Sequence, residues 1–444
     1  MGVFRQSVGP NGEAYPTPGT RMSESRHYVI VSQRYPPEKG GNASRIHDTA
    51  THLADERNDV TVLAPPPCYP PGNFERSWAR AGTEHVDGVT VRRLWSWQPQ
   101  RENPGLVRRL PYYLVFAFHA ALWLTWNVRS YDGLLTSTPP ITTGIPGFVA
   151  AVLGKPWVVD VRDLWIENAV SLGYIDPGSP LVRASHWFQR QVMHTADRLT
   201  VTTTTLGDAI VETYGPALRD RIRHVPNGVD TDLFSPREAS PSTDGGADSG
   251  PVIVYTGNIG TAQALEPCIR AMAHISREDA LLRLVGDGDE LTRLRDLIVE
   301  LGLEDRVEFV GLVDRDEVPV IINSAEVGLA PLQDTEELAY AMPTKTYEYL
   351  ACRVPVLVTG RGEVKRFVAE SGGGLHAKPT PRSVAAALDT LLEDSERRET
   401  MADDGFRHVT DRYDRAEIAN RLDEELRMVI EETSTGSVSS TPND

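Results

Sequence analysis

Short apolar segments alternate with amphipathic helical segments along nearly the whole chain, and no other feature constrains the fold as strongly. This alternation is typical of parallel α/β sheets, in which each helix returns the chain to the same edge of the sheet. The apolar segments form two series, one on each side of a polar stretch at 237–250 that is rich in Ser, Gly and Asp. The sequence therefore predicts two Rossmann-like domains that face each other across a cleft, where ligands bind at the carboxyl ends of the strands.

The expected elements follow from these patterns. The first series predicts strands at 28–32, 59–64, 88–95, 133–136, 157–161, 197–203 and 223–226, with a helix at 43–57. The second series predicts strands at 252–257, 281–286, 307–310, 327–329 and 354–358, with helices at 265–275, 291–301 and 318–324. Amphipathic segments at 382–392, 397–406 and 415–431 predict the last helices, and 237–250 is expected to be a flexible insertion.

Composition narrows the classes of partner. The formal net charge is −17, which would repel a phosphate backbone and argues against nucleic acid as a partner. Cys68, Cys268 and Cys352 lie far apart without CxxC spacing, so neither a zinc site nor a disulfide framework is expected. Residues 1–25 lack the apolar segment of a signal peptide. An acid-rich and lysine-poor chain also fits adaptation to high salt, and a halophilic protein in a reducing, cytoplasmic compartment is expected.

The segment 341–351 predicts a loop followed by the start of a helix. Pro343 suits the first helical turn, and Thr344 and Thr346 are expected to accept hydrogen bonds from free backbone amides. Such a helix start attracts anions, because its N–H groups and its dipole face outward. Lys345, one of only five lysines among 45 basic residues, adds a positive charge there, and Glu348 follows one turn later on the same face. The alternative is a surface lysine without a function.

Three further loops follow strands of the second series. Gly257 and Asn258 end the first strand, Gly286 ends the second, and Val313 follows the third, where it could form a wall for a base. Glycines let the backbone approach a phosphate closely, although a tight strand-to-helix turn explains the first loop equally well. Together with the helix start at Lys345, these loops predict a cradle for a phosphate. Asp287-Gly288-Asp289 imitates a metal-binding motif but is interpreted as a loop, so no metal is predicted.

The first series contributes two loops to the same cleft. Gly40 and Gly41 precede a helix whose start would face the cleft. Arg162 and Asp163 follow the strand at 157–161, where Arg162 can bind an anion and Asp163 can accept a hydrogen bond from a hydroxyl. The alternative is a structural Arg–Asp pair.

The segment 112–128 is apolar nearly all round and is flanked by Arg108, Arg109 and Arg129. A membrane-spanning helix needs about 20 apolar residues, so spanning is rejected. Flanking arginines with Trp and Tyr at both ends suit a helix that lies on a membrane surface. A buried helix of the first domain is an equal alternative, and one helix can serve both purposes by exposing one face.

At this point the chain resembles a known family. From about residue 28 to 431 it is similar to the retaining, metal-independent glycosyltransferases of family 4, which have the two-domain GT-B fold. The segments that carry the resemblance are 40–41, 196–202, 226–230 with Phe234 and Pro236, 286–288, and 347–356. The segments 257–266, 162–165 and 343–345 resemble the fucosamine-transferase branch of bacterial surface-polysaccharide assembly.

The resemblance implies roles for individual residues. Glu348 matches the second glutamate of the family's E-x7-E motif, which holds the ribose, while Tyr340 stands where the first glutamate is expected and Glu336 or Glu337 would have to substitute for it. The segment 261–264 lacks the Arg and Lys that many members carry, so Lys345 is expected to supply positive charge to the diphosphate. Arg162 stands where many members have histidine.

The sequence pattern and the resemblance together give a domain plan. A disordered tail is expected over 1–25, followed by an acceptor domain over 26–224 and a nucleotide-sugar domain over 225–410. A helix over 411–432 is expected to return and pack on the N-terminal domain, and 433–444 is expected to be a disordered tail.

The predicted activity is transfer of a hexose or N-acetylhexosamine from a nucleotide-diphosphate sugar, with UDP as the nucleotide, to a saccharide or lipid-linked saccharide. No divalent metal or other cofactor is expected. The cellular role would be cell-surface glycan or glycoprotein assembly in the cytoplasm, with membrane contact through 108–128. The expected catalytic residues are Lys345, Arg162 and Asp163, and the expected donor site comprises Gly40, Gly41, Gly257, Asn258, Gly286, Val313, Thr344, Lys345, Thr346 and Glu348. The alternatives are a UDP-sugar 2-epimerase and a non-catalytic scaffold of the same fold.

Overall fold

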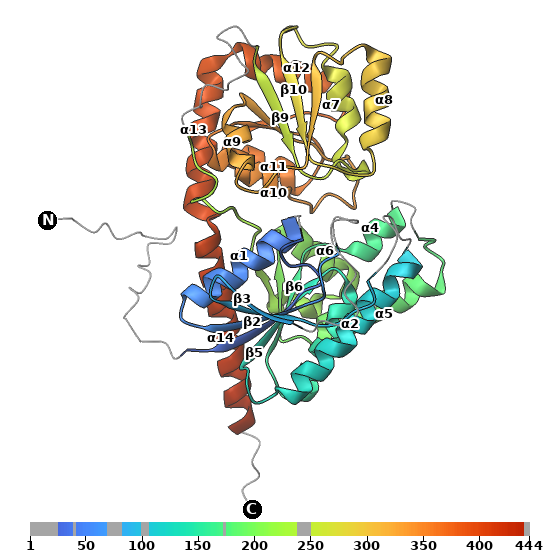
Figure 1. Cartoon of the computed structure of the whole chain (residues 1–444), viewed down its shortest axis with the longest axis vertical. Helices are drawn as coiled ribbons and strands as arrows, with labels where there is room; N and C mark the ends of the chain where they lie inside the picture. Colours follow the sequence, from blue (N-terminus) through green and yellow to red (C-terminus); the bar gives the residue numbers. More distant parts are fainter. Residues whose placement is uncertain are drawn as a thin grey trace, which may run out of the picture.

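The computed structural model describes residues 25–38, 41–68, 82–98, 106–171, 175–237 and 250–438. Two α/β domains lie one beyond the other along the long axis of the molecule, and the last two helices run along one side of both (Figure 1). The predicted fold class is therefore confirmed: two Rossmann-like domains are present, and the C-terminal helix returns to the first. The predictions for the tail before residue 25, for Gly40 and for most of the 237–250 insertion fall outside the described residues.

The N-terminal domain is built on one eight-stranded sheet with the order β3-β4-β2-β1-β5-β6-β7-β8. Its strands are β1 (His27–Val31), β2 (Asp59–Ala64), β3 (Gly82–Val86), β4 (Val89–Arg93), β5 (Gly133–Thr138), β6 (Trp157–Val161), β7 (Arg198–Val201) and β8 (Ile222–His224). Its helices are α1 (Gly41–Asp55), α2 (Leu106–Trp126), η1 (Ile141–Thr143), α3 (Gly144–Val152), α4 (Trp165–Ser171), α5 (Pro180–Thr195), α6 (Thr204–Tyr214) and η2 (Pro216–Arg221). Among the described strands of this sheet, β3 alone is antiparallel to its neighbour. The central strands β5 and β6 are buried on both faces, which fits their Leu- and Val-rich sequences.

The C-terminal domain has a six-stranded parallel sheet with the order β11-β10-β9-β12-β13-β14. Its strands are β9 (Val252–Thr256), β10 (Leu281–Val285), β11 (Val307–Gly311), β12 (Val327–Ala330), β13 (Val356–Val358) and β14 (Gly374–His376). Its helices are η3 (Thr261–Gln263), α7 (Leu265–Ala271), α8 (Leu291–Leu301), α9 (Val318–Asn323), α10 (Thr344–Ala351), α11 (Glu363–Ser371), α12 (Pro381–Glu393) and α13 (Ser395–Arg412). Nearly all predicted strands and helices are present, with ends shifted by a few residues.

The strand orders fix where a ligand can bind. In the first sheet β1 lies between β2 and β5, and in the second sheet β9 lies between β10 and β12, so the chain changes direction across the sheet at β1 and at β9. Crevices form outside the carboxyl ends of strands at such points, because the helices that follow lie on opposite faces. The residues that follow β1, β5, β9 and β12 therefore line the cavities described below.

The last helix, α14 (Arg415–Val438), leaves the C-terminal domain and packs on the N-terminal sheet (Figure 1). Its side chains Leu422, Leu426 and Val429 are buried in one cluster with Tyr28. The Tyr28 hydroxyl also donates a hydrogen bond of 2.7 Å to Asp423. The helix thus completes the core of the N-terminal domain, from which the whole C-terminal domain separates it in the sequence.

Two predicted boundaries at the C-terminus were wrong. Residues 411 and 412 belong to α13, and α14 begins only at Arg415, because Asp414 interrupts the helices and caps the amide of Ala416. The predicted disordered tail from 433 is helical as far as Val438, where the described part of the chain ends. The hydroxyl groups of Thr433, Ser434 and Thr435 each donate a hydrogen bond to the carbonyl one turn earlier in this helix.

Two short strands were not predicted. Strand β3 is mostly exposed, and it forms a hairpin with β4 through Asp87 and Gly88, which both have positive φ. This turn also explains why the strand expected at 88–95 covers only Val89–Arg93. Strand β14 has three residues, too few to give a pattern.

Helix α2 contains most of the segment 112–128, and it is buried on one face and exposed on the other. Tyr112, Phe116 and Leu124 are buried against the N-terminal domain, whereas Phe118 and Trp126 are 59% and 79% exposed. Among the helices in the described ranges, none combines the length and the apolar character needed to cross a membrane.

The return of α14 gives a direct test of packing. Leu426→Ala should reduce stability by about 2–5 kcal/mol, because it leaves a void between the helix and the sheet. Met428→Ala on the same helix is the control, since Met428 is 42% exposed and its loss should change stability by less than about 0.5 kcal/mol. Melting temperatures of the two variants give the comparison, and equal values would show that α14 is not part of the folded core.

Candidate functional site

A cleft of about 900 Å³ lies between the carboxyl ends of the two sheets. Ten of the residues predicted from sequence line it: Gly41, Arg162, Asp163, Gly257, Asn258, Gly286, Val313, Thr344, Lys345 and Glu348. Thr346 does not line it, since its side chain faces the interior of the C-terminal domain and is fully buried. Gly40 lies outside the described residues. The structure thus brings together residues that are up to about 300 positions apart in the sequence.

Helix α10 lines the cleft on the side of the C-terminal domain. It begins at Thr344 directly after Pro343, and no side chain caps its start. The expectation that Thr344 and Thr346 accept hydrogen bonds from the first amides was therefore wrong. The Thr346 hydroxyl is instead buried without a partner among the described residues. An uncapped helix start that faces a cleft remains available to an anionic group.

The position of α10 is set by Tyr349. The Tyr349 side chain is fully buried against Gly328, where any side chain would collide with its ring. Its hydroxyl accepts a hydrogen bond of 2.8 Å from the amide of Thr256, at the end of β9. The start of α10 is therefore held beside the loop that follows β9.

Lys345 extends from the first turn of α10 along this loop. Its Nζ atom lies 3.8 Å from the centre of the Tyr255 ring. Gly257 has a φ of 120°, and a Cβ atom there would stand 3.2 Å from the Lys345 Nζ atom. The backbone conformation therefore favours glycine at 257, and a side chain there would also press against the end of Lys345. Gly286 meets the same loop from the next strand, where a Cβ atom would overlap the Gly257 carbonyl.

Burial shifts the ionisation of this pair toward the neutral forms. Burial lowers the pKa of Lys345 to about 7, and the nearby charge of Glu348 opposes this shift only in part. Burial likewise raises the pKa of Glu348, against the charges of Lys345 and Arg315. Among the described residues, no carboxylate forms an ion pair with Lys345. A bound anion would supply the missing counter-charge.

The N-terminal side of the cleft is organised around Asp160. Its carboxylate accepts hydrogen bonds of 3.1 Å from both Arg45 and Arg162 and of 3.0 Å from Thr200. Although burial opposes ionisation, the two guanidinium groups hold the pKa of Asp160 below its usual range. Arg162 also donates to Asn42, and its Nη2 atom has no partner in the described structure. Arg162 is thus paired with Asp160 rather than with Asp163, so the structural pair considered from sequence is not formed.

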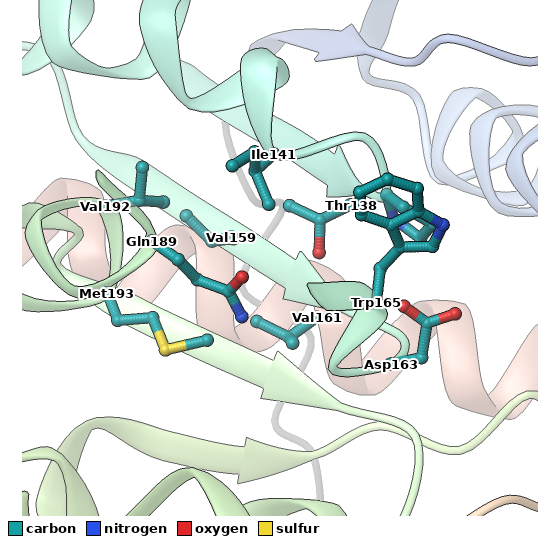
Figure 2. A pocket seen from close by; sticks show the side chains of 10 residues that line it. Thr138, Ile141, Val159, Val161, Asp163, Trp165, Gln189, Val192 and Met193 are labelled. Atoms are coloured by element: carbon teal, nitrogen blue, oxygen red, sulfur yellow. The ribbon is translucent and has the colours of Figure 1, made fainter. Parts of the chain in front are cut away.

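Asp163, next to Arg162, is also withdrawn from solvent. Burial raises its pKa to about 6, and the charge of Arg162 offsets this only partly. Its Oδ1 atom is buried, and no described group bonds to it. Figure 2 shows Asp163 and Trp165 at one end of a small cavity between β6 and α5, which also contains Gln189. Asp163 is therefore a carboxyl group that can accept from, or donate to, a hydroxyl in the cleft.

Tyr340 joins the two domains. It is 6% exposed and packs in the core of the N-terminal domain, although it belongs to the loop before α10. Its hydroxyl accepts a 3.1 Å hydrogen bond from the amide of Leu164, and its carbonyl accepts from Thr203. Neither Glu336 nor Glu337 lines the cleft, so neither takes the place of the glutamate that is absent at 340.

Sequence reasoning missed three charged residues of the cleft region. Arg315 donates hydrogen bonds of 2.9 and 2.6 Å to the buried carboxylate of Asp48, and Arg415 donates to the same group. Burial and the charge of Arg45 lower the pKa of Arg415 to about 10. Arg315 lies two residues after Val313, which was expected to line the cleft, so its position was weakly indicated by the sequence. The sequence around Asp48 and around Arg415 gives no indication that either residue lies near the cleft.

Within the described ranges, no three His, Cys, Asp or Glu side chains are grouped so that they could hold a metal ion. The absence of a metal requirement remains a prediction, because side chains alone do not show how a bound substrate would recruit a cation.

Comparison with known proteins identifies the class of protein. The family model described as glycosyl transferase 4-like domain matches residues 40–228, and the one described as glycosyl transferases group 1 matches residues 237–408. Together the two models cover most of the chain, which is therefore a glycosyltransferase.

Among curated relatives, the putative colanic acid biosynthesis glycosyl transferase WcaI of Escherichia coli is 23% identical over 377 residues, which cover 81% of this chain and 90% of that protein. A D-inositol 3-phosphate glycosyltransferase of Kineococcus radiotolerans is 32% identical over 238 residues, or 48% of this chain and 53% of that protein.

Solved structures share the fold. Sucrose-phosphate synthase from Thermosynechococcus elongatus has a TM-score of 0.73 at 20% identity, covering 92% of this chain and all of that one. Anabaena Alr3699/HepE, solved in complex with UDP-glucose, has a TM-score of 0.68 at 17% identity, covering 91% of this chain and all of that one.

The environment of Asp163 predicts a pH-dependent stability. Because its pKa is raised from 3.8 to about 6, the folded state binds this proton more tightly than the unfolded state does. Wild type should therefore lose up to about 3 kcal/mol from this group as the pH rises from about 4 to about 6. Asp163→Asn removes this loss, so its melting temperature relative to wild type should increase over that range and stay constant above it. The exposed Asp208→Asn is the control, and parallel curves for Asp163→Asn and wild type would contradict the assignment.

Proposed function

We propose that this protein is a retaining glycosyltransferase that moves a hexose or N-acetylhexosamine from a UDP-sugar to a saccharide or lipid-linked saccharide, without a divalent metal. The observation that carries the proposal is Lys345 at the uncapped start of α10, which faces Arg162 and Asp163 across one cleft. A cation and free amides suit a diphosphate, and a free guanidinium nitrogen with a carboxyl group suits the sugar and an attacking hydroxyl. The relative named for colanic acid biosynthesis supports a role in surface-polysaccharide assembly, and the UDP-glucose complex of the Anabaena protein supports UDP as the nucleotide.

The proposed reaction proceeds on one face of the donor sugar. The acceptor hydroxyl attacks the anomeric carbon from the side on which the bond to the diphosphate breaks, and its proton passes to the departing phosphate oxygen. This course retains the anomeric configuration and needs no covalent intermediate. Lys345 and the first amides of α10 stabilise the negative charge that develops on the diphosphate, which is electrostatic catalysis by preorganised groups. Glu348 would bind the ribose, and Asp163 would orient the acceptor hydroxyl.

Membrane contact forms part of the proposal. Leu114, Phe118 and Trp126 on α2 are 47%, 59% and 79% exposed, and Arg129 follows the end of the helix. Exposed apolar and aromatic side chains next to arginine favour the surface of an anionic membrane. We propose that this face of α2 rests on the inner side of the cell membrane, where a lipid-linked acceptor would be reached.

The first test is release of UDP from UDP-sugars in the presence of EDTA, in parallel with GDP- and dTDP-sugars. Wild type should release UDP without added metal, and Lys345→Ala should reduce kcat by about 10²–10³-fold, because the leaving diphosphate loses its cation. Lys365→Ala, on the surface of α11, should have wild-type activity. An NMR spectrum of the product should show the anomeric configuration of the donor.

Each alternative outcome has a distinct meaning. Donor binding without release, with any acceptor, would support a non-catalytic scaffold. An altered configuration at C2 of the recovered sugar would support an epimerase. Activity unchanged by Lys345→Ala would remove Lys345 from the mechanism.

The low pKa of Lys345 predicts how donor binding depends on pH. In the free protein this lysine is half charged near pH 7, and a bound diphosphate favours the charged form. The affinity for UDP-glucose should therefore decrease by up to about tenfold per pH unit above pH 7, and it should be constant below about pH 6. Calorimetric titrations between pH 5.5 and 9 measure this dependence. In Lys345→Met the affinity should be lower and independent of pH, and a flat wild-type curve would contradict the prediction.

A further inference from the structure

The N-terminal domain contains a second cavity, of about 400 Å³, which is bounded by α2, η1, α4 and α5. Its walls are largely apolar and include Leu110, Ile145, Ile166, Val182 and Phe188. On the outer side it reaches Leu114 and Leu181, which are 47% and 38% exposed. The cavity therefore extends from the interior of the domain to the surface between α2 and α5.

At its inner end the cavity has polar groups without partners. Gln33, two residues after the end of β1, is 1% exposed, and neither its amide nitrogen nor its amide oxygen has a hydrogen-bond partner among the described residues. The hydroxyl of Thr142 is buried in the same way, and both residues line the cavity. Buried polar groups are nearly always satisfied, because an unpaired one reduces stability. An unpaired amide that lines a cavity indicates a ligand with both a donor and an acceptor.

The inner end of the cavity also adjoins the cleft. Asn42 lies in the first turn of α1 and lines the cavity. It accepts a hydrogen bond from Arg162, which lines the cleft. Gln33 and Pro139 follow the adjacent strands β1 and β5, where the strand order places the ligand crevice of this sheet. A molecule could therefore fill the cavity with an apolar part and still present a polar part to Arg162 and Asp163.

We propose that this cavity binds the apolar chain of a lipid-linked acceptor, and that the Gln33 amide and Thr142 hydroxyl bond to the polar group at which the chain joins the saccharide. The inference rests on the proposed transferase function and specifies its acceptor. Exposed aromatic side chains are present on both helices that flank the opening: Phe118 on α2 is 59% exposed and Trp187 on α5 is 64% exposed. Such side chains favour contact of these helices with a membrane surface, from which a chain could enter the cavity.

Binding of alkyl β-glucosides, from methyl to octyl and below their micellar concentrations, tests the proposal by calorimetry. Affinity for wild type should increase by about fourfold per CH₂ group until the cavity is filled. Ile145→Trp, which fills the cavity from α3, should abolish this dependence on chain length. Val152→Trp on the same helix is the matched control, because Val152 is 87% exposed, and it should behave as wild type does.

Two further variants keep the test decisive if Ile145→Trp disturbs folding. Ser185→Trp fills the cavity from α5 and should have the same effect. Gln33→Leu should raise the melting temperature, since it removes an unpaired buried amide, while it weakens octyl glucoside binding by about tenfold.

UDP binding, measured on every variant, separates the two claims. Wild type that fails to bind UDP contradicts the proposed function. Two results would overturn the proposed chain site while UDP binding is normal. The first is an affinity of wild type for the alkyl glucosides that does not depend on chain length. The second is a dependence on chain length that persists in both tryptophan variants. Adsorption of the glucosides to the exposed face of α2 alone would leave the dependence on chain length unchanged in both tryptophan variants.

Discussion

The relative position of the two domains depends on the buried carboxylate of Asp48. It lies on α1 of the N-terminal domain and accepts hydrogen bonds from Arg315, in the loop after β11, and from Arg415, the first residue of α14. One carboxylate thus joins the first domain, the second domain and the helix that returns between them. A buried charge is tolerated only when it is well paired, so loss of either arginine would leave a partly unpaired group at the domain boundary. Tyr340 adds a second connection, through Leu164 and Thr203, on the other side of the cleft.

This arrangement places Lys345 and Asp163 in one cleft, and both have pKa values that differ from those of the same groups in water. Lys345 on one wall and Asp163 on the other both have pKa values shifted toward their neutral forms, in each case chiefly by burial. In the free protein no carboxylate among the described residues pairs with Lys345, and the Oδ1 atom of Asp163 accepts no hydrogen bond from them. A diphosphate would supply a counter-charge to Lys345, and a hydroxyl would donate a hydrogen bond to Asp163. The cleft is therefore better matched to an anionic sugar donor and a hydroxyl acceptor than to water. In the proposed mechanism, this preorganisation takes the place of a nucleophile and a metal.

Most of the fold could be predicted from the sequence, because the alternation of apolar strands and amphipathic helices is a local pattern. The candidate site was predictable where its residues lie in loops at strand ends, as for Gly257, Gly286 and Arg162, or at a helix start, as for Lys345. It was not predictable where a residue acts through a distant partner. Asp48 and Arg415 are 367 positions apart, and no sequence pattern records their contact. The hydroxyls of Thr344 and Thr346 appeared suited to cap α10, but packing buries Thr346 on the opposite side. Gln33 gave no signal at all, since an unpaired amide is visible only when its surroundings are known.

The most direct test of the account is hydrogen exchange of the backbone amides with and without UDP. In the proposed donor site the diphosphate lies between the start of α10 and the loop after β9. UDP should therefore slow exchange at Thr344 and Lys345 and at Gly257 and Asn258, and this effect should be weaker in Lys345→Ala. Slowed exchange confined to the N-terminal domain, or UDP binding without any change at these amides, would contradict the assignment of the donor site.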